Sequence, residues 1–287
     1  MKTKKNNILN SLIVISVLFV VVGCVCNSGR ESGGDTNSAS TDETSQSGSL
    51  KKDSGDFIVE HMGVKNQRYE SIDRSIRKNK TLEKAADKLN RSLILPHDIP
   101  LRAKDCDGVA NAFYMSRDKS ITMCYELMEY FYRTFKRSGD SDEKANDRMN
   151  KAVTFIFLHE LGHALIDAYQ LPITANEEDA ADRCSSYICI EELGDDGVKA
   201  VVAAAEFFAI QSKSGGQRSA KVMADEHLLN EQRFFNSLCM IYGSDPQKYN
   251  GLVVNNLLPK ARAVRCPNEY QRTASSWSKL LKPWRKD

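Results

Sequence analysis

The spacing of hydrophobic and polar residues divides the chain from about residue 57 to residue 124 into short strands and helices. Apolar runs at Phe57–Val59 and Ile99–Ala103 predict strands. Between them, apolar residues recur every three or four positions up to about Leu93, which predicts helices. Two further runs, Asn111–Tyr114 and Ser120–Cys124, lie on either side of a turn and predict a hairpin.

The rest of the chain has mainly helical spacing. We expect helices at 125–137, 141–170, 195–210 and 224–242. Ser141 and the acids after it suit a helix N-terminus, and Pro172 stops that helix. Thr174-x-x-Glu177 indicates a capping box at the start of another helix. The pattern therefore predicts a mostly helical α+β fold with a small sheet.

Residues 1–23 have the features of an export signal. Three lysines precede an apolar run, Ile8–Val22, which is too short to span a bilayer comfortably. The run ends in Val21-Val22-Gly23-Cys24, which resembles the lipobox of bacterial lipoproteins and predicts cleavage before Cys24 and lipidation of that residue. An uncleaved signal anchor and an ordinary secretory peptide are the alternatives.

Residues 24–55 are expected to carry this lipid and to form a flexible tether, because Ser, Gly, Thr, Asp and Asn dominate them. Residues 56–287 are then expected to form a single domain. Such a protein would be exported and held on a membrane, facing the periplasm or the cell surface.

The charge of the chain gives no support to a nucleic-acid partner. The formal net charge is +2, and removing residues 1–23 takes away three lysines and no acids, so that it becomes −1. Hydrophobic residues make up 41% of the chain and charged residues 27%, which is the balance of an ordinary globular protein.

The strongest chemical signal is His159-Glu160-Leu161-Gly162-His163. Histidines four positions apart share one helix face, so both rings can bind one zinc ion. Glu160 lies too far round to join them as a ligand, but it can accept a proton from the attacking water. An accidental match is expected in about 0.005 of chains of this composition, which favours the zinc site over the alternative of two buried core histidines. Gly162 costs about 1 kcal/mol relative to alanine inside a helix and indicates a close approach by another element.

The third metal ligand is expected after Pro172, in the acidic segment Glu177-Glu178-Asp179. The residue four positions further on distinguishes the three acids. Glu178 has Asp182 on its own helix face, so Glu178 as the ligand and Asp182 as the partner of the His159 ring would complete the site together. The alternative is that these acids only stabilise the N-terminus of a helix.

His159 to His163 followed by Glu178 to Asp182 resembles the gluzincin pattern, HExxH and then a glutamate with an aspartate four residues later. Together with Asn111–Tyr114 and Cys124–Leu127, these residues resemble a bacterial metallopeptidase-like family known mainly as a domain of unknown function. The resemblance covers most of residues 57–275. It implies a zincin-like fold and peptidase activity.

Two further roles follow from the likeness to thermolysin-like enzymes. Asn111-Ala112-Phe113-Tyr114 resembles their Asn-Ala-Phe-Trp edge strand, which implies a strand beside the HExxH helix that pairs with extended substrate. His227 is the only histidine after the zinc motif and is the candidate for stabilising the oxyanion, with a capping or surface position as the alternative. The metzincin pattern is excluded, because it needs Gly and His where this chain has Ile166 and Tyr169.

Six cysteines follow the predicted tether region, which fits an oxidising compartment. Cys106 with Cys124 and Cys239 with Cys266 are candidate disulfides, although six cysteines allow fifteen connectivities. Cys184 and Cys189 are poorly spaced for a bridge if both are helical.

The sequence therefore predicts a zinc-dependent endopeptidase with one zinc ion per chain, bound by His159, His163 and Glu178, and with Glu160 as general base. A zinc amidase acting on cell-wall peptide and a non-catalytic surface-binding lipoprotein are the alternatives. The expected partners are a peptide or protein substrate and a membrane reached through the N-terminal lipid. The oligomeric state is left open.

Overall fold

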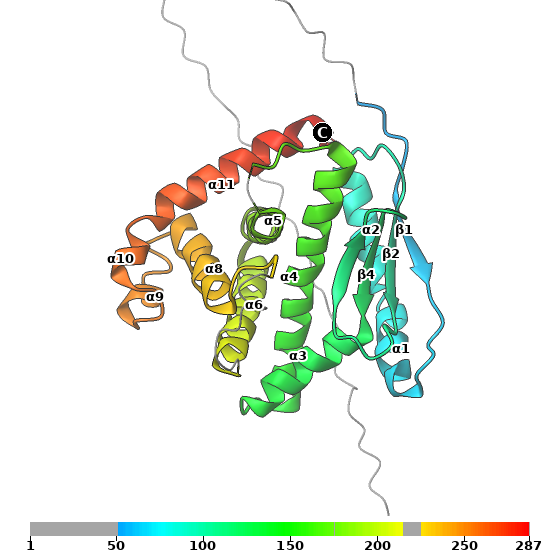
Figure 1. Ribbon diagram of the computed structural model, residues 1–287, viewed down its shortest axis with the longest axis horizontal. Coiled ribbons are helices and arrows are strands. Elements are labelled where there is room, and N and C mark those ends of the chain that lie inside the picture. Colours follow the sequence, from blue (N-terminus) through cyan, green and yellow to red (C-terminus); the bar gives the residue numbers. More distant parts are fainter. Residues whose placement is uncertain (1–50, 175, 215–224, 287) are drawn as a thin grey trace, which may run out of the picture.

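A four-stranded sheet lies on one side of the molecule and a group of helices on the other, with one long helix between them (Figure 1). This computed structural model describes residues 51–174, 176–214 and 225–286. The predicted signal peptide, Cys24 and most of the predicted tether lie outside the described residues. Within the described residues, no helix is long and apolar enough to cross a membrane.

The sheet contains the four strands that the hydrophobic pattern predicted. They are β1 (Phe57–His61), β2 (Ile99–Lys104), β3 (Ala112–Met115) and β4 (Ser120–Cys124), in the order β1-β2-β4-β3. β2 runs parallel to both of its neighbours, whereas β3 is antiparallel to β4 and forms an edge. The predicted edge strand is thus confirmed, shifted by one residue, and so is the α+β class.

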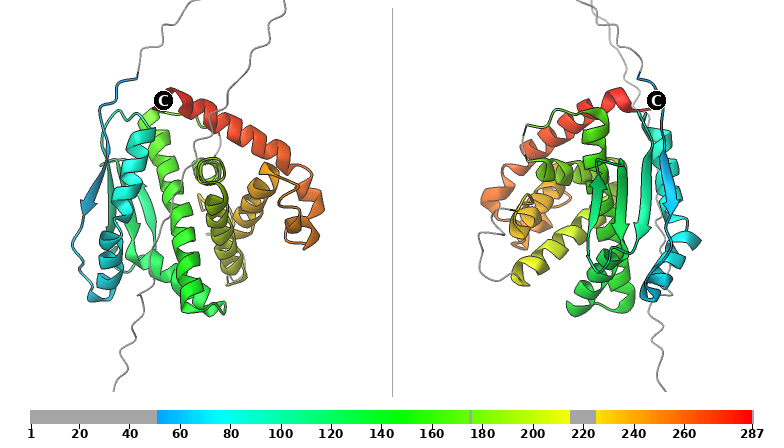
Figure 2. Two further views of the ribbon diagram at one scale, coloured as in Figure 1. Left: turned by 180° about the vertical axis from the view of Figure 1, so that it is seen from behind. Right: turned by 45° about the vertical axis from the view of Figure 1, so that its right-hand side comes forward.

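Two short helices cover part of the sheet beside β1. They are α1 (Glu70–Lys78), which follows the 3-10 turn η1 (Gln67–Tyr69), and α2 (Thr81–Ser92). The side chain of Asn90 binds both backbone groups of Phe57, accepting from its N–H at 2.7 Å and donating to its carbonyl at 3.1 Å. This clamp fixes α2 to the first strand. The view from behind in Figure 2 shows α1 and α2 lying in front of the sheet.

The central helix is α4 (Asp142–Tyr169), which follows α3 (Tyr125–Arg137). Its predicted start is confirmed, because the Ser141 side chain caps the helix by accepting from the N–H of Lys144. It ends at Gln170 in the left-handed conformation, two residues before Pro172. The helix is buried on several sides, which explains its nearly continuous apolar composition.

The remaining helices pack against α4 and against one another on the side away from the sheet (Figure 1). They are α5 (Glu177–Glu192), α6 (Gly194–Ser214), α8 (Asn230–Ser244), α9 (Gly251–Val254), α10 (Lys260–Ala263), α11 (Cys266–Leu281) and the 3-10 turn η2 (Lys282–Trp284). α4 and α5 cross closely at Gly162, where an added Cβ would lie 3.1 Å from the Cα of Ala181. The close approach predicted from Gly162 is therefore present.

Two predicted helix starts were wrong. The N-cap of α5 is Asn176 and not Thr174, and its side chain accepts from the N–H of Asp179 at 3.2 Å. α8 begins at Asn230 and not near residue 224, because the Asp225 side chain accepts from the N–H of His227 at 2.9 Å. In both cases a local side-chain bond sets where the chain becomes helical, as the N-cap of α5 at Asn176 and as the bend held by Asp225 before α8, and apolar spacing does not reveal such bonds.

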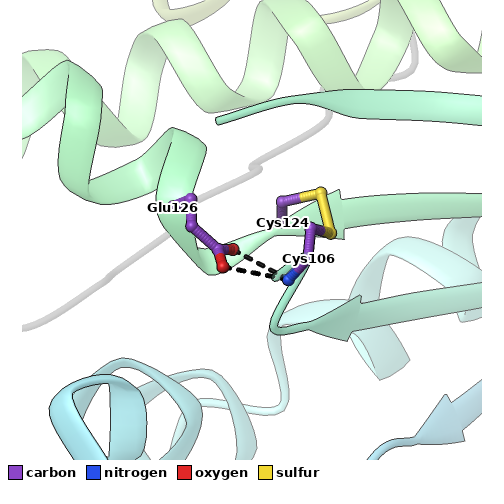
Figure 3. A group of neighbouring side chains, drawn as sticks. All are labelled: Cys106, Cys124 and Glu126. Carbon is purple, nitrogen blue, oxygen red and sulfur yellow. Dashed lines mark hydrogen bonds between the residues drawn. A yellow bond between two sulfur atoms is a disulfide. The ribbon is translucent and has the colours of Figure 1, made fainter. Parts of the chain in front are cut away.

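The two candidate disulfides are both confirmed, with Cα–Cα distances of 5.5 Å for Cys106–Cys124 and 5.1 Å for Cys239–Cys266. The first joins the loop after β2 to the end of β4. Both carboxylate oxygens of Glu126 accept from the N–H of Cys106, which holds this loop against α3 (Figure 3). Cys184 and Cys189 are buried free thiols, as predicted.

Candidate metal centre

The two histidines of α4 converge at one point, as their spacing predicts. The Nε2 atoms of His159 and His163 are 3.2 Å apart. Each ring uses its other nitrogen to bind a carboxylate: Nδ1 of His159 donates to Asp182 at 2.9 Å, and Nδ1 of His163 donates to Glu177 at 2.8 Å. Since an ionised carboxylate can only accept, both Nδ1 atoms donate a proton, which leaves both Nε2 atoms directed at the shared point.

Glu178 brings a third donor atom to this point. Its Oε2 lies 3.1 Å from Nε2 of His159 and 3.5 Å from Nε2 of His163. These three donor atoms form a group that could hold a metal ion, all within 4.8 Å of one another. Glu177, the neighbouring acid, is turned to the far side of the His163 ring. The structure thus distinguishes the two glutamates in the way the i+4 argument predicted, whereas their roles toward a metal stay predictions.

Electrostatics around His159 favour a positive charge in the centre. His159 is 3% exposed, and burial by itself would lower the pKa of its imidazole. Hydrogen bonds to Asp182 and Glu178 outweigh that burial and raise the pKa of His159 to about 9. A metal ion bound between these groups would also supply a positive charge, which the carboxylates of Asp182 and Glu178 stabilise.

Arg233, which sequence reasoning did not select, completes the support of His159. Its guanidinium binds Asp182 twice, with Nε 2.8 Å from Oδ2 and Nη2 2.8 Å from Oδ1, and stacks on the ring of Phe208 at 4.1 Å. Burial would raise the pKa of Asp182, but the charge of Arg233 and the His159 hydrogen bond hold it well below its usual value. The sequence feature that could have pointed to Arg233 is its position as a lone arginine beside Phe234 and Phe235 in an apolar helix.

The candidate base lies between α4 and the edge strand. Glu160 is 6% exposed, and its Oε2 accepts from the backbone N–H of Tyr114 at 2.8 Å. Burial raises the pKa of the Glu160 carboxyl, and the histidines and the Tyr114 N–H oppose that rise. The link from Tyr114 to Glu160 is a direct contact between β3 and the HExxH helix. Nothing in the local sequence of either element reveals it.

β3 forms one wall of an open cleft of about 1150 Å³, and the three metal-binding candidates are among the residues that line it. Asn111, Ala112, Phe113 and Tyr114 all line this cleft. The hydroxyl of Tyr114 donates to Asp167 at 2.6 Å, and Lys119 binds the same carboxylate oxygen at 2.8 Å. This three-residue contact ties the edge strand to the end of α4.

His227 lies in the bend before α8 and reaches the centre from the opposite wall. Its Nε2 is 2.9 Å from Oε2 of Glu178, and its ring lies nearly parallel to that of His159, with centroids 6.1 Å apart. Nδ1 is held by Asp225 at 3.1 Å. The structure therefore brings His227 to the site, in a bend and not in the expected helix, and leaves its role a prediction.

Comparison with known proteins agrees with the chemistry of this site. Residues 62–281 match the family model DUF4344, described as "Putative metallopeptidase". The chain belongs to this family. No curated protein and no solved structure matches it. Membership of a metallopeptidase family implies a bound metal, so the donor atoms can be tested for their fit to one.

The separations of the donor atoms are close to those of a small tetrahedral ion. Ligand atoms about 2.0–2.2 Å from a tetrahedral zinc ion lie roughly 3.3–3.6 Å apart. The three donors are 3.1, 3.2 and 3.5 Å apart, so the two shorter separations fall just below that range. Two imidazoles and a carboxylate are also the set found in catalytic zinc sites of metallopeptidases. A second acid and thiol cluster, Cys106, Cys124 and Glu126, does not fit because both sulfurs are in the disulfide.

Proposed function

We propose that this member of the metallopeptidase family is a zinc-dependent endopeptidase. The observation that carries the proposal is the convergence of His159, His163 and Glu178 within 4.8 Å, in a cleft that also contains the buried carboxyl of Glu160. A site that held the metal only as structure would be expected to use a fourth protein ligand and to be closed. This one opens into a cleft of about 1150 Å³, slightly above the usual range for small-molecule sites.

A zinc ion bound by these three residues would supply Lewis acidity and lower the pKa of water at the site. Glu160 is the group that accepts the proton of the attacking water and passes it to the leaving nitrogen. Burial raises the pKa of this carboxyl, which favours both steps near neutral pH. The N–H of Tyr114 fixes one oxygen of Glu160 through its 2.8 Å hydrogen bond and so orients the other.

The edge strand binds the substrate backbone. In an antiparallel pair, backbone groups alternate between the partner strand and the free edge. Tyr114 directs its N–H into the cleft toward Glu160, so Ala112, two residues earlier, has its backbone groups on the same free edge. An extended peptide can add there as a further strand, which holds many sequences through one backbone.

His227 donates a hydrogen bond to the carbonyl oxygen of the scissile bond as that oxygen becomes negative. Two observations support this role: Nε2 faces the centre, 2.9 Å from Glu178, and Asp225 holds Nδ1. The side chain of His227 is 46% exposed, so the ring can turn toward a substrate.

The test is hydrolysis of a peptide library by the full-length protein and by the Glu160→Gln variant, each with its zinc content measured. We expect wild type to cleave internal peptide bonds and Glu160→Gln to retain zinc but lose about 10²- to 10⁴-fold in rate. Equal zinc with no cleavage by either protein would contradict the proposal. Cleavage of cell-wall peptide amides alone would support the amidase in its place.

We also propose that a lipid on Cys24 holds the domain on a membrane facing the periplasm or the cell surface. The support is the sequence Val21-Val22-Gly23-Cys24 after an apolar run. Cells that express the full-length protein should incorporate labelled palmitate into it, and Cys24→Ser should abolish the label. Label retained on Cys24→Ser would contradict this attachment.

A further inference from the structure

The C-terminal part of the described chain carries an excess of positive charge. Residues 246–286 contain nine lysines and arginines and a single acid, Glu269. Four of these cations are paired with acids: Lys248 with Asp195, Arg262 with Glu269, Arg285 with Glu192 and Lys286 with Asp53. The other five form no ion pair with any residue that the structure describes: Lys260, Arg265, Arg272, Lys279 and Lys282.

Three of the unpaired cations form a line along the outer side of α11. Arg265 is the N-cap of the helix, and Arg272 and Lys279 follow seven and fourteen residues later. Successive cations therefore point to nearly the same side, about 10 Å apart along the axis. All three are exposed, whereas the buried side of α11 packs mainly against α8. The exposed residues between the cations are uncharged: Asn268, Gln271, Ser275 and Ser276.

The acids packed around α11 leave most of this charge uncancelled. Four charges of both signs pair with one another beside the helix: Asp179 and Glu269 with Arg183 and Arg262. Glu191 and Asp245 have no cationic partner in the described part of the chain. Glu191 accepts from a tyrosine hydroxyl, and Asp245 accepts from two backbone N–H groups. The five unpaired cations outnumber these two acids, so this side of the molecule is positive.

An apolar tip lies at the N-terminal end of α11. α9 and α10 lie there, at the end of the molecule far from the sheet (Figure 1). Val254 and Val264 are 67% and 71% exposed, the highest values among the large apolar side chains of the described residues, and Leu257 is 50% exposed. Leu258 and Ala263, which are next to them in sequence, are buried in a core cluster. The tip is thus a fixed part of the fold that presents apolar side chains to solvent.

The described chain begins beside the other end of α11. The Lys51 ammonium lies over the ring of Trp284 at 4.4 Å, and Asp53 binds Lys286 at 2.5 Å. Trp284 belongs to η2, which directly follows α11. A lipid on Cys24, as proposed above, would therefore hold the protein from the C-terminal end of the helix whose outer side is basic.

We propose that this side of the molecule docks on an anionic phospholipid membrane. The docking surface consists of four cations and three apolar side chains, and we call it the α11 surface: Lys260, Arg265, Arg272, Lys279, Val254, Leu257 and Val264. Each cation near an anionic bilayer favours binding about fivefold. Apolar side chains that enter the headgroup region add burial. A soluble polyanion would match the cations but would leave the apolar tip in water.

The α11 surface shares no residue with the metal cleft, so its test is separate from that of the peptidase activity. The reporter is Val264→Trp in the full-length protein, reconstituted with vesicles that contain phosphatidylglycerol and brominated phosphatidylcholine. We expect the bromine atoms to quench the new tryptophan. Quenching should fall at least fivefold in vesicles without phosphatidylglycerol and in about 1 M salt, which screens charge. No quenching in the anionic vesicles would overturn the proposal.

Two further reporters test the position of the surface. Leu257→Trp lies on the same apolar tip and should be quenched as Val264→Trp is. Val109→Trp is the matched control, because Val109 is 58% exposed and lies outside the α11 surface. We expect no quenching of the control above that in vesicles without phosphatidylglycerol. Equal quenching at positions 109 and 264 would overturn the proposed orientation.

The role of the cations is tested in the Val264→Trp protein. Arg265→Gln, Arg272→Gln and Lys279→Gln together should lower quenching in anionic vesicles at least fivefold, with thermal unfolding near that of the parent. The control set changes three exposed, unpaired cations of other helices and should leave quenching unchanged: Lys78→Gln, Lys84→Gln and Arg137→Gln. Equal loss in both sets would overturn the proposal, since it would reflect net charge alone.

Polyphosphate distinguishes a membrane from a soluble polyanion. Added to docked protein, it should compete with the vesicles only weakly, because it offers nothing to Val254, Leu257 and Val264. Calorimetric binding of polyphosphate that depends on Arg265, Arg272 and Lys279, without any quenching by vesicles, would overturn the membrane in favour of a soluble polyanion.

Discussion

The two sides of α4 provide neighbouring residues with opposite surroundings. Glu160 faces the metal cleft, where it meets the Tyr114 N–H and the two histidines, and Leu161 lies in the hydrophobic core on another side of the helix. One residue is about 100° round the helix from the next. A single helix can therefore carry a polar site and an apolar wall without mixing them.

The two sides of α4 are also stabilised in different ways. On the metal side, carboxylates hold the outer nitrogens of both histidines, and Arg233 holds Asp182 in turn. These contacts fix geometry and have partners more than ten positions away in sequence. On the side of Leu161, stability comes from apolar burial, which has no direction. The two sides should therefore respond differently to substitution.

The largest effect should come from the metal side, with Glu178→Ala. Removing a ligand should lower zinc affinity by more than about 100-fold, since loss of an outer partner alone costs 10- to 100-fold. Zinc content after dialysis against a weak chelator measures it. Glu177→Ala is the matched control, because it removes only the contact to Nδ1 of His163. Full zinc occupancy in Glu178→Ala, with loss in Glu177→Ala, would reverse the ligand assignment.

The next effect should come from the apolar side, with Leu161→Ala. Leu161 is fully buried, so the change should lower the free energy of unfolding by about 2–5 kcal/mol. Denaturant unfolding of the zinc-loaded protein measures the loss. The folded fraction should keep its zinc affinity and its peptidase rate. A large loss of zinc at unchanged stability would show that the two sides of α4 are coupled.

A smaller effect is expected for Asp182→Asn, which keeps the shape of the side chain and removes its charge. The amide no longer balances Arg233 or holds His159 in one orientation, so zinc affinity should fall about 10- to 100-fold. Competition with a zinc-binding dye measures the affinity. An unchanged affinity would mean that Arg233 and Asp182 contribute only to the fold.

The smallest effect is expected at the crossing of α4 and α5, with Gly162→Ala. Alanine gains about 1 kcal/mol of helix propensity. Its Cβ would lie 3.2 Å from the Cβ of Cys184 as well as close to Ala181, so a slight shift of α5 should offset that gain. We expect a change in unfolding free energy of at most about 1 kcal/mol. A loss above about 2 kcal/mol would show that the crossing cannot relax.

Much of the fold could be predicted because its signals are local. The strands were found from short apolar runs, and the start of α4 from Ser141 and the acids after it. The start of α5 after Asn176 and the start of α8 at Asn230 were missed, because the side-chain bonds that set them join residues two or three positions apart and leave the apolar period unchanged. Apolar spacing reports burial, and it does not report hydrogen bonds.

The sequence by itself determined that His159 and His163 share one helix face, since four residues make nearly one turn of any α-helix. It also placed Glu178 and Asp182 on one face of the next helix for the same reason. Only the tertiary structure decided that Arg233 meets Asp182, 51 positions away, and that Tyr114 meets Glu160 across 46 positions. Such contacts depend on how helices and strands pack together, and the spacing of apolar residues along the sequence does not encode that packing.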